Sequence, residues 1–263
     1  MHKEHCGAWM APFFELIGLH FSLHELGGIH VKRMMETWRH VFKLDPDREL
    51  SDEALEAVCL SGTDAIMVGG SSGVTYENTV DLMSRIRKFE LPCVLEVSDL
   101  EAVVPGFDLY MIPMVLNTEH SQWLIGRHQQ AVERYGYMIP WELVVPEGYI
   151  ILNPDSTAGH LTEANSKLDA SEAAAYAQTA ERLLSLPIIY IEYSGSFGDM
   201  ELVAQVQRSL GQARLFYGGG ITDEETALKA AKVSDTVIVG NAVYQDLESA
   251  LKTVAAVKGR ALA

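Results

Sequence analysis

Eight short apolar segments alternate with helical segments from Met35 onward, and this repetition constrains the fold more than any other feature of the chain. The apolar segments are nearly continuous, which is typical of parallel strands covered on both faces. Parallel strands require crossover helices, and eight of them favour a closed barrel over an open sheet. We therefore predict a single α/β domain over residues 35–263, a (β/α)8 barrel. The expected strands are 38–43, 65–68, 93–97, 109–113, 149–153, 188–193, 215–217 and 236–239, and the expected helices are 52–61, 79–89, 121–135, 171–184, 199–210, 223–232 and 245–257.

The last two expected strands both end on glycine. Gly218-Gly219-Gly220 closes the seventh strand, and Gly240-Asn241 follows the eighth. Glycine lets the backbone approach an anion and direct N–H groups at it, and a following helix adds its positive end. Two such ends on adjacent strands are typical of the phosphate site of this kind of barrel. The sequence therefore predicts a small phosphorylated ligand.

The overall charge limits the partners of the chain. Its 263 residues include 36 acidic and 20 basic side chains, a formal net charge of -16. Such a chain would repel nucleic acid, so we exclude general nucleic-acid binding and expect any phosphate to be held locally. Three cysteines without paired or metal-ligand spacing, and no run long enough to span a bilayer, favour a cytoplasmic protein.

Residues 1–34 differ from the repeats that follow, because they hold five of the nine histidines and show no strand-like pattern. Their apolar residues fall on one face of a short helix, although Gly18 weakens the helix and Glu15 interrupts any signal-peptide core. We favour an added or mis-started leader outside the barrel, since Met34-Met35 offers a natural start. A genuine accessory helix and an interfacial membrane anchor remain alternatives.

Lys43 and Asp45 are two residues apart at the end of the first strand, so their side chains share one face of the strand. This places a cation and a carboxylate together at the barrel mouth. We interpret Lys43 as a phosphate contact and Asp45 as a Mg2+ ligand, with a structural salt bridge as the alternative. The loop 69–73 after the second strand offers amides and hydroxyls nearby, although a glycine-rich turn can also be a plain connection. The long connection 153–168 is expected to be a flap over the site.

Glu192 interrupts the apolar sixth strand, and its side chain shares a face with those of Tyr190 and Ser194. A carboxylate inside an apolar strand is costly unless it is paired or used. Glu192 could orient a substrate hydroxyl or accept its proton, whereas pairing with a neighbouring lysine is the structural alternative. Glu96, near the end of the third strand, is a similar case.

Eight motifs together are far more specific than any glycine turn: WRHVFKLDP (38–46), GTDA (62–65), VGGS (68–71), LPCVLEV (91–97), VPGFD (104–108), YIEYSG (190–195), FYGGGI (216–221) and VGNAVY (239–244). In this combination the chain resembles the geranylgeranylglyceryl phosphate synthase family, and most closely its bacterial heptaprenylglyceryl phosphate synthase branch. The resemblance covers essentially all of residues 36–259 and leaves residues 1–34 outside it.

The resemblance implies a TIM-barrel prenyltransferase that joins sn-glycerol 1-phosphate to a long polyprenyl diphosphate through an ether bond, with Mg2+, and that works as a homodimer. It implies Asp45 and Ser71 as the Mg2+ ligands. Anchoring the acceptor phosphate would align its free hydroxyl with the allylic carbon, and we expect Glu192 to be the catalytic residue that accepts the hydroxyl proton. The implied glycerol phosphate contacts are Lys43, Tyr190, Ile191, Glu192, Tyr193, Ser194, Gly195, Gly220, Gly240 and Asn241.

The length of the donor is expected to depend on Ala131. The archaeal branch of the family stops its donor groove with a bulky aromatic side chain on a helix, whereas this chain has the small Ala131 in the expected helix 121–135. We therefore expect a heptaprenyl donor, and transient contact with a membrane surface when that lipid is collected.

Three alternatives remain open at this point. A geranylgeranyl-specific enzyme would perform the same reaction with a shorter donor. A sugar-phosphate isomerase or aldolase would share the glycine ends. It would need a Schiff-base lysine or an acid/base pair at mid-barrel, and it would need no prenyl groove. A phosphate-binding protein without catalysis is disfavoured by the presence of Lys43, Asp45, Ser71 and Glu192.

Overall fold

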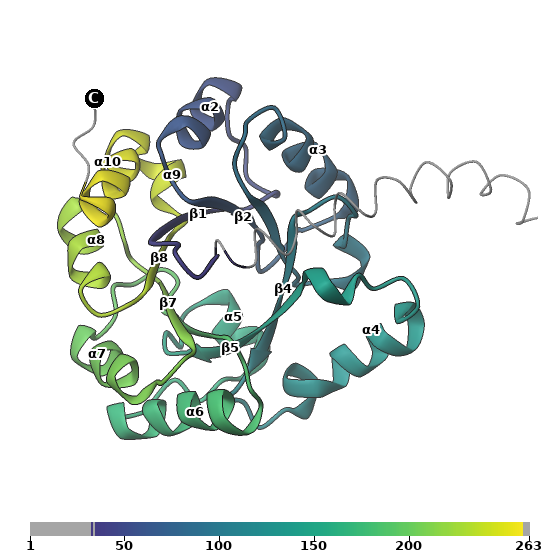
Figure 1. Cartoon of the computed structure of the whole chain (residues 1–263), viewed down its shortest axis with the longest axis vertical. Helices are drawn as coiled ribbons and strands as arrows, with labels where there is room; N and C mark the ends of the chain where they lie inside the picture. Colours follow the sequence, from purple (N-terminus) through teal and green to yellow (C-terminus); the bar gives the residue numbers. More distant parts are fainter. Residues whose placement is uncertain (1–32, 34, 260–263) are drawn as a thin grey trace, which may run out of the picture.

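The computed structural model describes Arg33 and residues 35–259, so that, Arg33 apart, the predictions for residues 1–34 lie outside the described residues. Eight parallel strands close into a barrel in sequence order, and helices surround it (Figure 1). The predicted (β/α)8 barrel is therefore confirmed. The strands are β1 (His40–Leu44), β2 (Ala65–Val68), β3 (Cys93–Glu96), β4 (Leu109–Val115), β5 (Val144–Ile151), β6 (Ile188–Glu192), β7 (Arg214–Gly218) and β8 (Thr236–Val239).

The helices begin where side chains cap them. Asp169 and Thr75 each form a reciprocal capping box with the residue three positions on, which satisfies amides that the first helical turn leaves free. In the described part of the chain, no helix combines the length and apolar character needed to cross a bilayer. The helices are α2 (Asp52–Leu60), α3 (Tyr76–Ile86), α4 (Arg127–Tyr135), α5 (Thr157–Thr162), α6 (Ala170–Leu183), α7 (Met200–Ser209), α8 (Glu224–Ala231), α9 (Ala242–Gln245) and α10 (Leu247–Lys258), with short turns η1 (Leu100–Ala102), η2 (Gln122–Gly126, a π-helix) and η3 (Trp141–Leu143).

Each strand divides its side chains between two cores. One core fills the barrel interior, and the other lies between the strands and the helices. Small residues on the helix faces, such as Ala177 in α6 and Ala227 in α8, let the helices pack close to the sheet. Because each of these neighbouring strand pairs is parallel, the carboxyl ends of the strands meet at one mouth.

Besides shifts of one to three residues at other element ends, such as α3 at Tyr76–Ile86 rather than 79–89, four segments differ from the predictions. The fifth strand runs over Val144–Ile151 rather than 149–153, because Pro146, Glu147 and Gly148 break the apolar pattern although they belong to the sheet. The expected helix 121–135 is divided into the π-helical turn η2 and α4, and the expected helix 245–257 into α9 and α10 at Asp246, which caps α10. The connection 153–168 contains α5, capped by Ser156.

His40 gives the fold a testable pH dependence. Its ring is buried, with its nitrogens 3.0 Å from Thr63 Oγ1 and 2.9 Å from Thr253 Oγ1. Burial lowers the pKa of His40 from 6.5 to about 3. Between pH 6.5 and about 3, the unfolded chain therefore binds a proton at His40 that the folded chain does not bind. The contribution of neutral His40 to the free energy of unfolding is complete above pH 6.5 and is lost as the pH falls toward 3.

We expect His40→Gln to remove this dependence. Between pH 6.5 and about pH 4.5, the free energy of unfolding of the wild type should fall by ~2–3 kcal/mol more than that of the variant. Urea unfolding of both proteins across this range measures the difference. The titration of the carboxylates contributes equally to both proteins and therefore cancels from the difference. Parallel pH profiles for the two proteins would contradict the assignment.

Candidate active site

A cavity of about 1340 Å³ opens at the carboxyl ends of the strands. Of the thirteen residues expected to contact the substrates or the metal or to set the donor length, eleven line it: Lys43, Asp45, Ser71, Ala131, Tyr190, Glu192, Ser194, Gly195, Gly220, Gly240 and Asn241. Ile191 and Tyr193 do not, because their side chains pack in the outer core against the helices. The backbone N–H of Tyr193 is also occupied, since it donates to Gly218 O at 2.7 Å.

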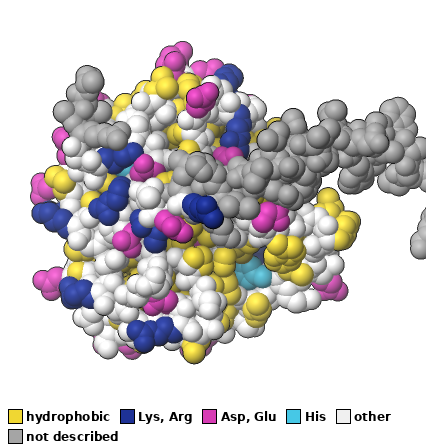
Figure 2. All heavy atoms as spheres, viewed as in Figure 1, with side chains coloured by type: hydrophobic (Ala, Val, Ile, Leu, Met, Phe, Trp, Pro, Cys, Tyr) yellow, Lys and Arg dark blue, Asp and Glu magenta, His cyan; other side chains and the backbone are white. Residues whose placement is uncertain are grey.

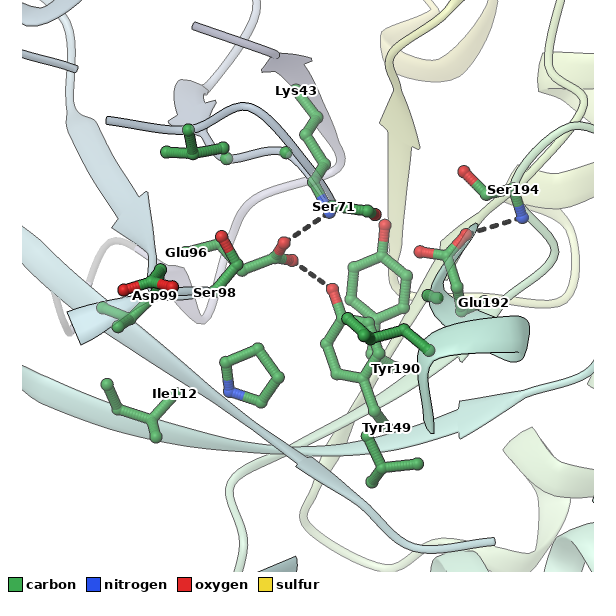
Figure 3. Close-up of a pocket in the computed structure, with 18 of the residues that line it drawn as sticks. Lys43, Ser71, Glu96, Ser98, Asp99, Ile112, Tyr149, Tyr190, Glu192 and Ser194 are labelled. Atoms are coloured by element: carbon green, nitrogen blue, oxygen red, sulfur yellow. Dashed lines mark hydrogen bonds and ion pairs between the residues drawn. The ribbon is translucent and has the colours of Figure 1, made fainter. Parts of the chain in front are cut away.

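Lys43 lies at the centre of the polar end and pairs with Glu96 (Figure 3). Its Nζ is 2.5 Å from Glu96 Oε2, while the hydroxyl of Tyr149 donates to Glu96 Oε1. Burial opposes the charge on Lys43, but Glu96, Glu192 and Glu147 outweigh it and raise the pKa of the ammonium. Lys43 is thus a fixed cation, paired with Glu96 rather than with Asp45.

Two stacked tyrosines form the wall beside this ion pair. The rings of Tyr149 and Tyr190 are 4.4 Å apart and nearly parallel, at 16°, and Lys43 Nζ is 5.7 Å from the centre of the Tyr190 ring. Sequence reasoning missed Tyr149 because the fifth strand was placed too late. The alternation of Val145, Glu147, Tyr149 and Ile151 along β5 was the signal that could have found it.

Glu192 is buried on the opposite side of the mouth (Figure 3). Its Oε1 accepts the backbone N–H of Ser194 at 2.6 Å. Burial raises the pKa of Glu192 to about 7, with Lys43 opposing the rise and Glu96 adding to it. A carboxyl group that titrates near neutral pH inside a cavity is suited to accept and release a proton.

Glu147 is a further buried acid, and sequence reasoning missed it. It is fully enclosed, and neither of its carboxyl oxygens has a hydrogen-bond partner among the described residues. Burial, with a further contribution from Glu96, raises the pKa of Glu147 well above its usual value. The buried environment therefore disfavours a negative charge on Glu147.

Glycines shape the rim of the mouth at the ends of β7 and β8. Gly219 and Gly220 have φ angles of +148° and +57°, and a side chain on either would collide with the backbone of the loop after β6. At Gly240 the nearest atom to an added methyl group would be Lys43 O, at 3.4 Å, which is an ordinary contact. Gly240 also lines the cavity, so a methyl group there fits without a clash and lies beside the proposed phosphate site.

The helical turns behind this rim differ from expectation. α8 begins only at Glu224 and is capped by the side chain of Asp223, so its positive end is already neutralised. The turn directly behind Gly240 is the short α9, which follows Asn241 at once. Arg48 lies beside it and donates from Nη1 to Asn241 Oδ1 at 2.9 Å, which brings a further cation to the mouth.

Asp45 and Ser71 are brought together at the ends of β1 and β2. The carboxylate of Asp45 packs on Gly70, the residue before Ser71, and it accepts the N–H of Asp47 at 3.0 Å. Burial raises the pKa of Asp45, so its charge is poorly stabilised by the protein alone. The described residues include no cluster of three or more His, Cys, Asp or Glu able to hold a metal. A carboxylate and a hydroxyl nevertheless fit a Mg2+ ion that takes its remaining ligands from phosphate oxygens and water.

The other end of the cavity is apolar and lies between the barrel and α4. Ile112, Met114, Trp123 and Trp141 line it together with Ala131. Figure 2 shows hydrophobic side chains gathered on the lower right of the molecule, the side on which α4 stands in Figure 1. One cavity therefore joins a polar, glycine-rimmed mouth to an apolar groove.

This combination defines a class: a (β/α)8 barrel with a phosphate-type rim, a buried acid and an extended apolar groove. Residues 33–258 match the PcrB family, and the chain belongs to it. A heptaprenylglyceryl phosphate synthase of Geobacillus kaustophilus is 54% identical over 224 residues, which cover 85% of this chain and 94% of that protein. The protein of the same name from Bacillus subtilis is 55% identical over 222 residues, 84% of this chain and 97% of the relative.

A solved structure shares the fold. The (S)-3-O-geranylgeranylglyceryl phosphate synthase of Thermoplasma acidophilum, in complex with its substrate sn-glycerol-1-phosphate, superimposes with a TM-score of 0.77 at 23% identity. The superposition covers 88% of this chain and 97% of that one. The family resemblance seen in the sequence is confirmed by these relatives.

The two glycines at the rim should respond differently to a methyl group. Gly220→Ala forces a positive φ and a collision with the β6–α7 loop, so we expect it to lose ~1–3 kcal/mol of stability. Gly240→Ala should unfold at the wild-type temperature but fill the space where a phosphate would sit. Thermal unfolding and inorganic phosphate titration of both variants measure these effects. Undiminished phosphate binding by Gly240→Ala would place the anion elsewhere.

Proposed function

We propose that this protein transfers a polyprenyl group from its diphosphate to sn-glycerol 1-phosphate, forming an ether bond and releasing diphosphate. The single observation that supports this most is the continuous cavity with one polar and one apolar end. A small phosphorylated acceptor fits the glycine rim, and a long hydrocarbon fits the groove beneath α4. The names of the relatives in the PcrB family agree with both substrates.

The acceptor is held at the ends of β6, β7 and β8. Its phosphate takes backbone N–H groups at Gly220, Gly240 and Asn241, and Lys43 supplies the cation. Tyr190, Ser194 and Gly195, which line the cavity, enclose the glycerol. The bound phosphate directs the free hydroxyl of the glycerol toward Glu192.

Glu192 then acts as the general base. The hydroxyl oxygen attacks the first carbon of the prenyl chain, the bond from that carbon to the diphosphate oxygen breaks, and Glu192 takes the hydroxyl proton. Its pKa of about 7 keeps a large share of the carboxyl ionised at neutral pH while leaving it basic enough to accept the proton.

Asp45 and Ser71 would hold a Mg2+ ion at the same mouth. When bound, that ion would neutralise the charge that develops on the departing diphosphate. The poorly stabilised charge of Asp45 fits this role, because a divalent cation would offset the burial that raises its pKa.

A sugar-phosphate isomerase or aldolase fits the site less well. A Schiff-base lysine needs a lowered pKa, whereas the surrounding carboxylates raise the pKa of Lys43. The apolar groove would also have no use in that chemistry.

We further propose that the protein is a cytoplasmic homodimer that touches a membrane surface transiently. The membrane contact follows from the donor, because a free prenyl chain of this length partitions into a bilayer and has to be collected there. The homodimer is what the family resemblance implies.

The donor specificity tests the function directly. Incubated with labelled sn-glycerol 1-phosphate and prenyl diphosphates of several lengths, the protein should make an ether lipid and prefer heptaprenyl to geranylgeranyl diphosphate. Ala131→Trp fills the groove and should reverse the preference, so that geranylgeranyl diphosphate is used about tenfold better than heptaprenyl diphosphate, a difference of ~1.4 kcal/mol. Gln129→Trp, which places the same ring on the exposed face of α4, is the control. Absence of product with every donor would refute the function, and a wild-type preference for the shorter donor would refute the length assignment.

Glu192 should control turnover rather than affinity. Glu192→Gln keeps the shape of the side chain but cannot accept a proton, so kcat should fall about 100-fold or more with little change in KM for the acceptor. The wild-type kcat should rise with pH through about 7, because only the ionised carboxylate is a base. Steady-state kinetics over that range measure both effects. Near-normal turnover by the variant would exclude Glu192 as the base.

A further inference from the structure

The helix α4 is attached to the barrel in an unusual way. None of its side chains is buried, although it covers the apolar groove and carries Ala131. Figure 1 shows it standing off from the strands, unlike α6 or α10. A helix in a soluble protein is normally held by an apolar face packed on the core, so α4 must be held in place by something else.

The strand beneath α4 leaves a carbonyl group to be satisfied. β3 ends at Glu96, which pairs with Met111, and Val97 N–H donates to Met111 O at 2.9 Å. β4 continues past that point to Val115, so the carbonyl of Pro113 points the same way as that of Met111 but lies beyond the end of β3. Residues 112–114 are correspondingly only half-buried. They form the floor of the groove, and a backbone C=O there needs a donor.

His128 of α4 supplies that donor. Its Nε2 is 3.0 Å from Pro113 O, and because a carbonyl can only accept, Nε2 bears the proton. The other ring nitrogen, Nδ1, is buried and has no hydrogen-bond partner within the described residues. Among these residues, this is the hydrogen bond that joins an α4 side chain to a barrel strand. An imidazole with a bare buried nitrogen is a poor packing residue, so its bond to Pro113 is the reason for its position.

We propose that His128 is a positioning residue that clamps α4 over β4 and thereby fixes the width of the donor groove. His128 is three residues before Ala131, so both side chains lie on the same face of the helix. The clamp therefore sets how far Ala131 stands from the floor at residues 112–114. Selection of donor length would then depend on the position of α4 as well as on the size of residue 131. This inference rests on the proposed prenyl transfer.

Two readouts separate the clamp from the chemistry. Loss of one hydrogen bond should raise amide hydrogen exchange across residues 127–135 about fivefold in His128→Ala, with the barrel strands unchanged. The ratio of kcat/KM for heptaprenyl over geranylgeranyl diphosphate should fall by a similar factor, and KM for sn-glycerol 1-phosphate should stay within about twofold.

Matched variants identify the hydrogen bond as the cause. The amide of His128→Gln reaches far enough to donate to Pro113 O and should restore both readouts. The shorter amide of His128→Asn should not, and it keeps the test valid if His128→Ala fails to fold. Gln129→Ala, on the exposed face of α4, is the control and should behave as the wild type.

The outcomes distinguish the two levels of the proposal. A wild type that transfers no prenyl group refutes the function, while hydrogen exchange still decides whether His128 holds α4. An active wild type whose His128→Ala and His128→Asn variants keep the normal exchange and donor ratio overturns the clamp. Loss of discrimination that His128→Gln fails to restore, without faster exchange, also overturns it.

Discussion

The ion pair between Lys43 and Glu96 is the interaction on which the rest of the site depends. A lysine in the barrel interior would lose its proton without a counter-charge, and Glu96 prevents this at 2.5 Å. Tyr149 donates to the second oxygen of the same carboxylate and stacks on Tyr190. The lysine in turn limits the rise in the pKa of Glu192. One pair thus fixes a cation, an aromatic wall and the basicity of the opposite acid.

The proposed binding of a phosphate dianion by so acidic a protein requires that the carboxyl groups near the anion be paired or protonated. Among the buried carboxyl groups near Lys43, Glu96 is paired with the lysine, and burial raises the pKa of Glu147 and so disfavours its charge. Glu192 has a pKa of about 7 and therefore changes its charge near neutral pH. In the proposed function, the attraction for the anion comes from Lys43 and from backbone amides at the glycine rim, which need no counter-charge of their own.

The sequence predicted those parts of the structure that follow from local pattern. Apolar runs ending on glycine located β7 and β8, and the motif around Lys43 and Asp45 located the mouth. The pattern failed at β5, because Glu147 is a polar residue within the strand and reads as an interruption, although it is buried and burial raises its pKa. The roles of Tyr149 and His128 depend on contacts 53 and 15 residues apart in the chain, which no local spacing reveals.

The loose attachment of α4 is a consequence of what the groove would have to accept. The other helices gain their stability by burying small apolar faces against the strands, as α6 does with Ala173 and Ala177. A helix packed in that way leaves no space for a hydrocarbon chain. If α4 is held instead by a directional bond from His128 to a strand carbonyl, its position is defined while the volume beneath it stays open. The burial that α4 lacks in the free protein would then be supplied by the prenyl chain itself, so that donor binding and ordering of the helix become one event.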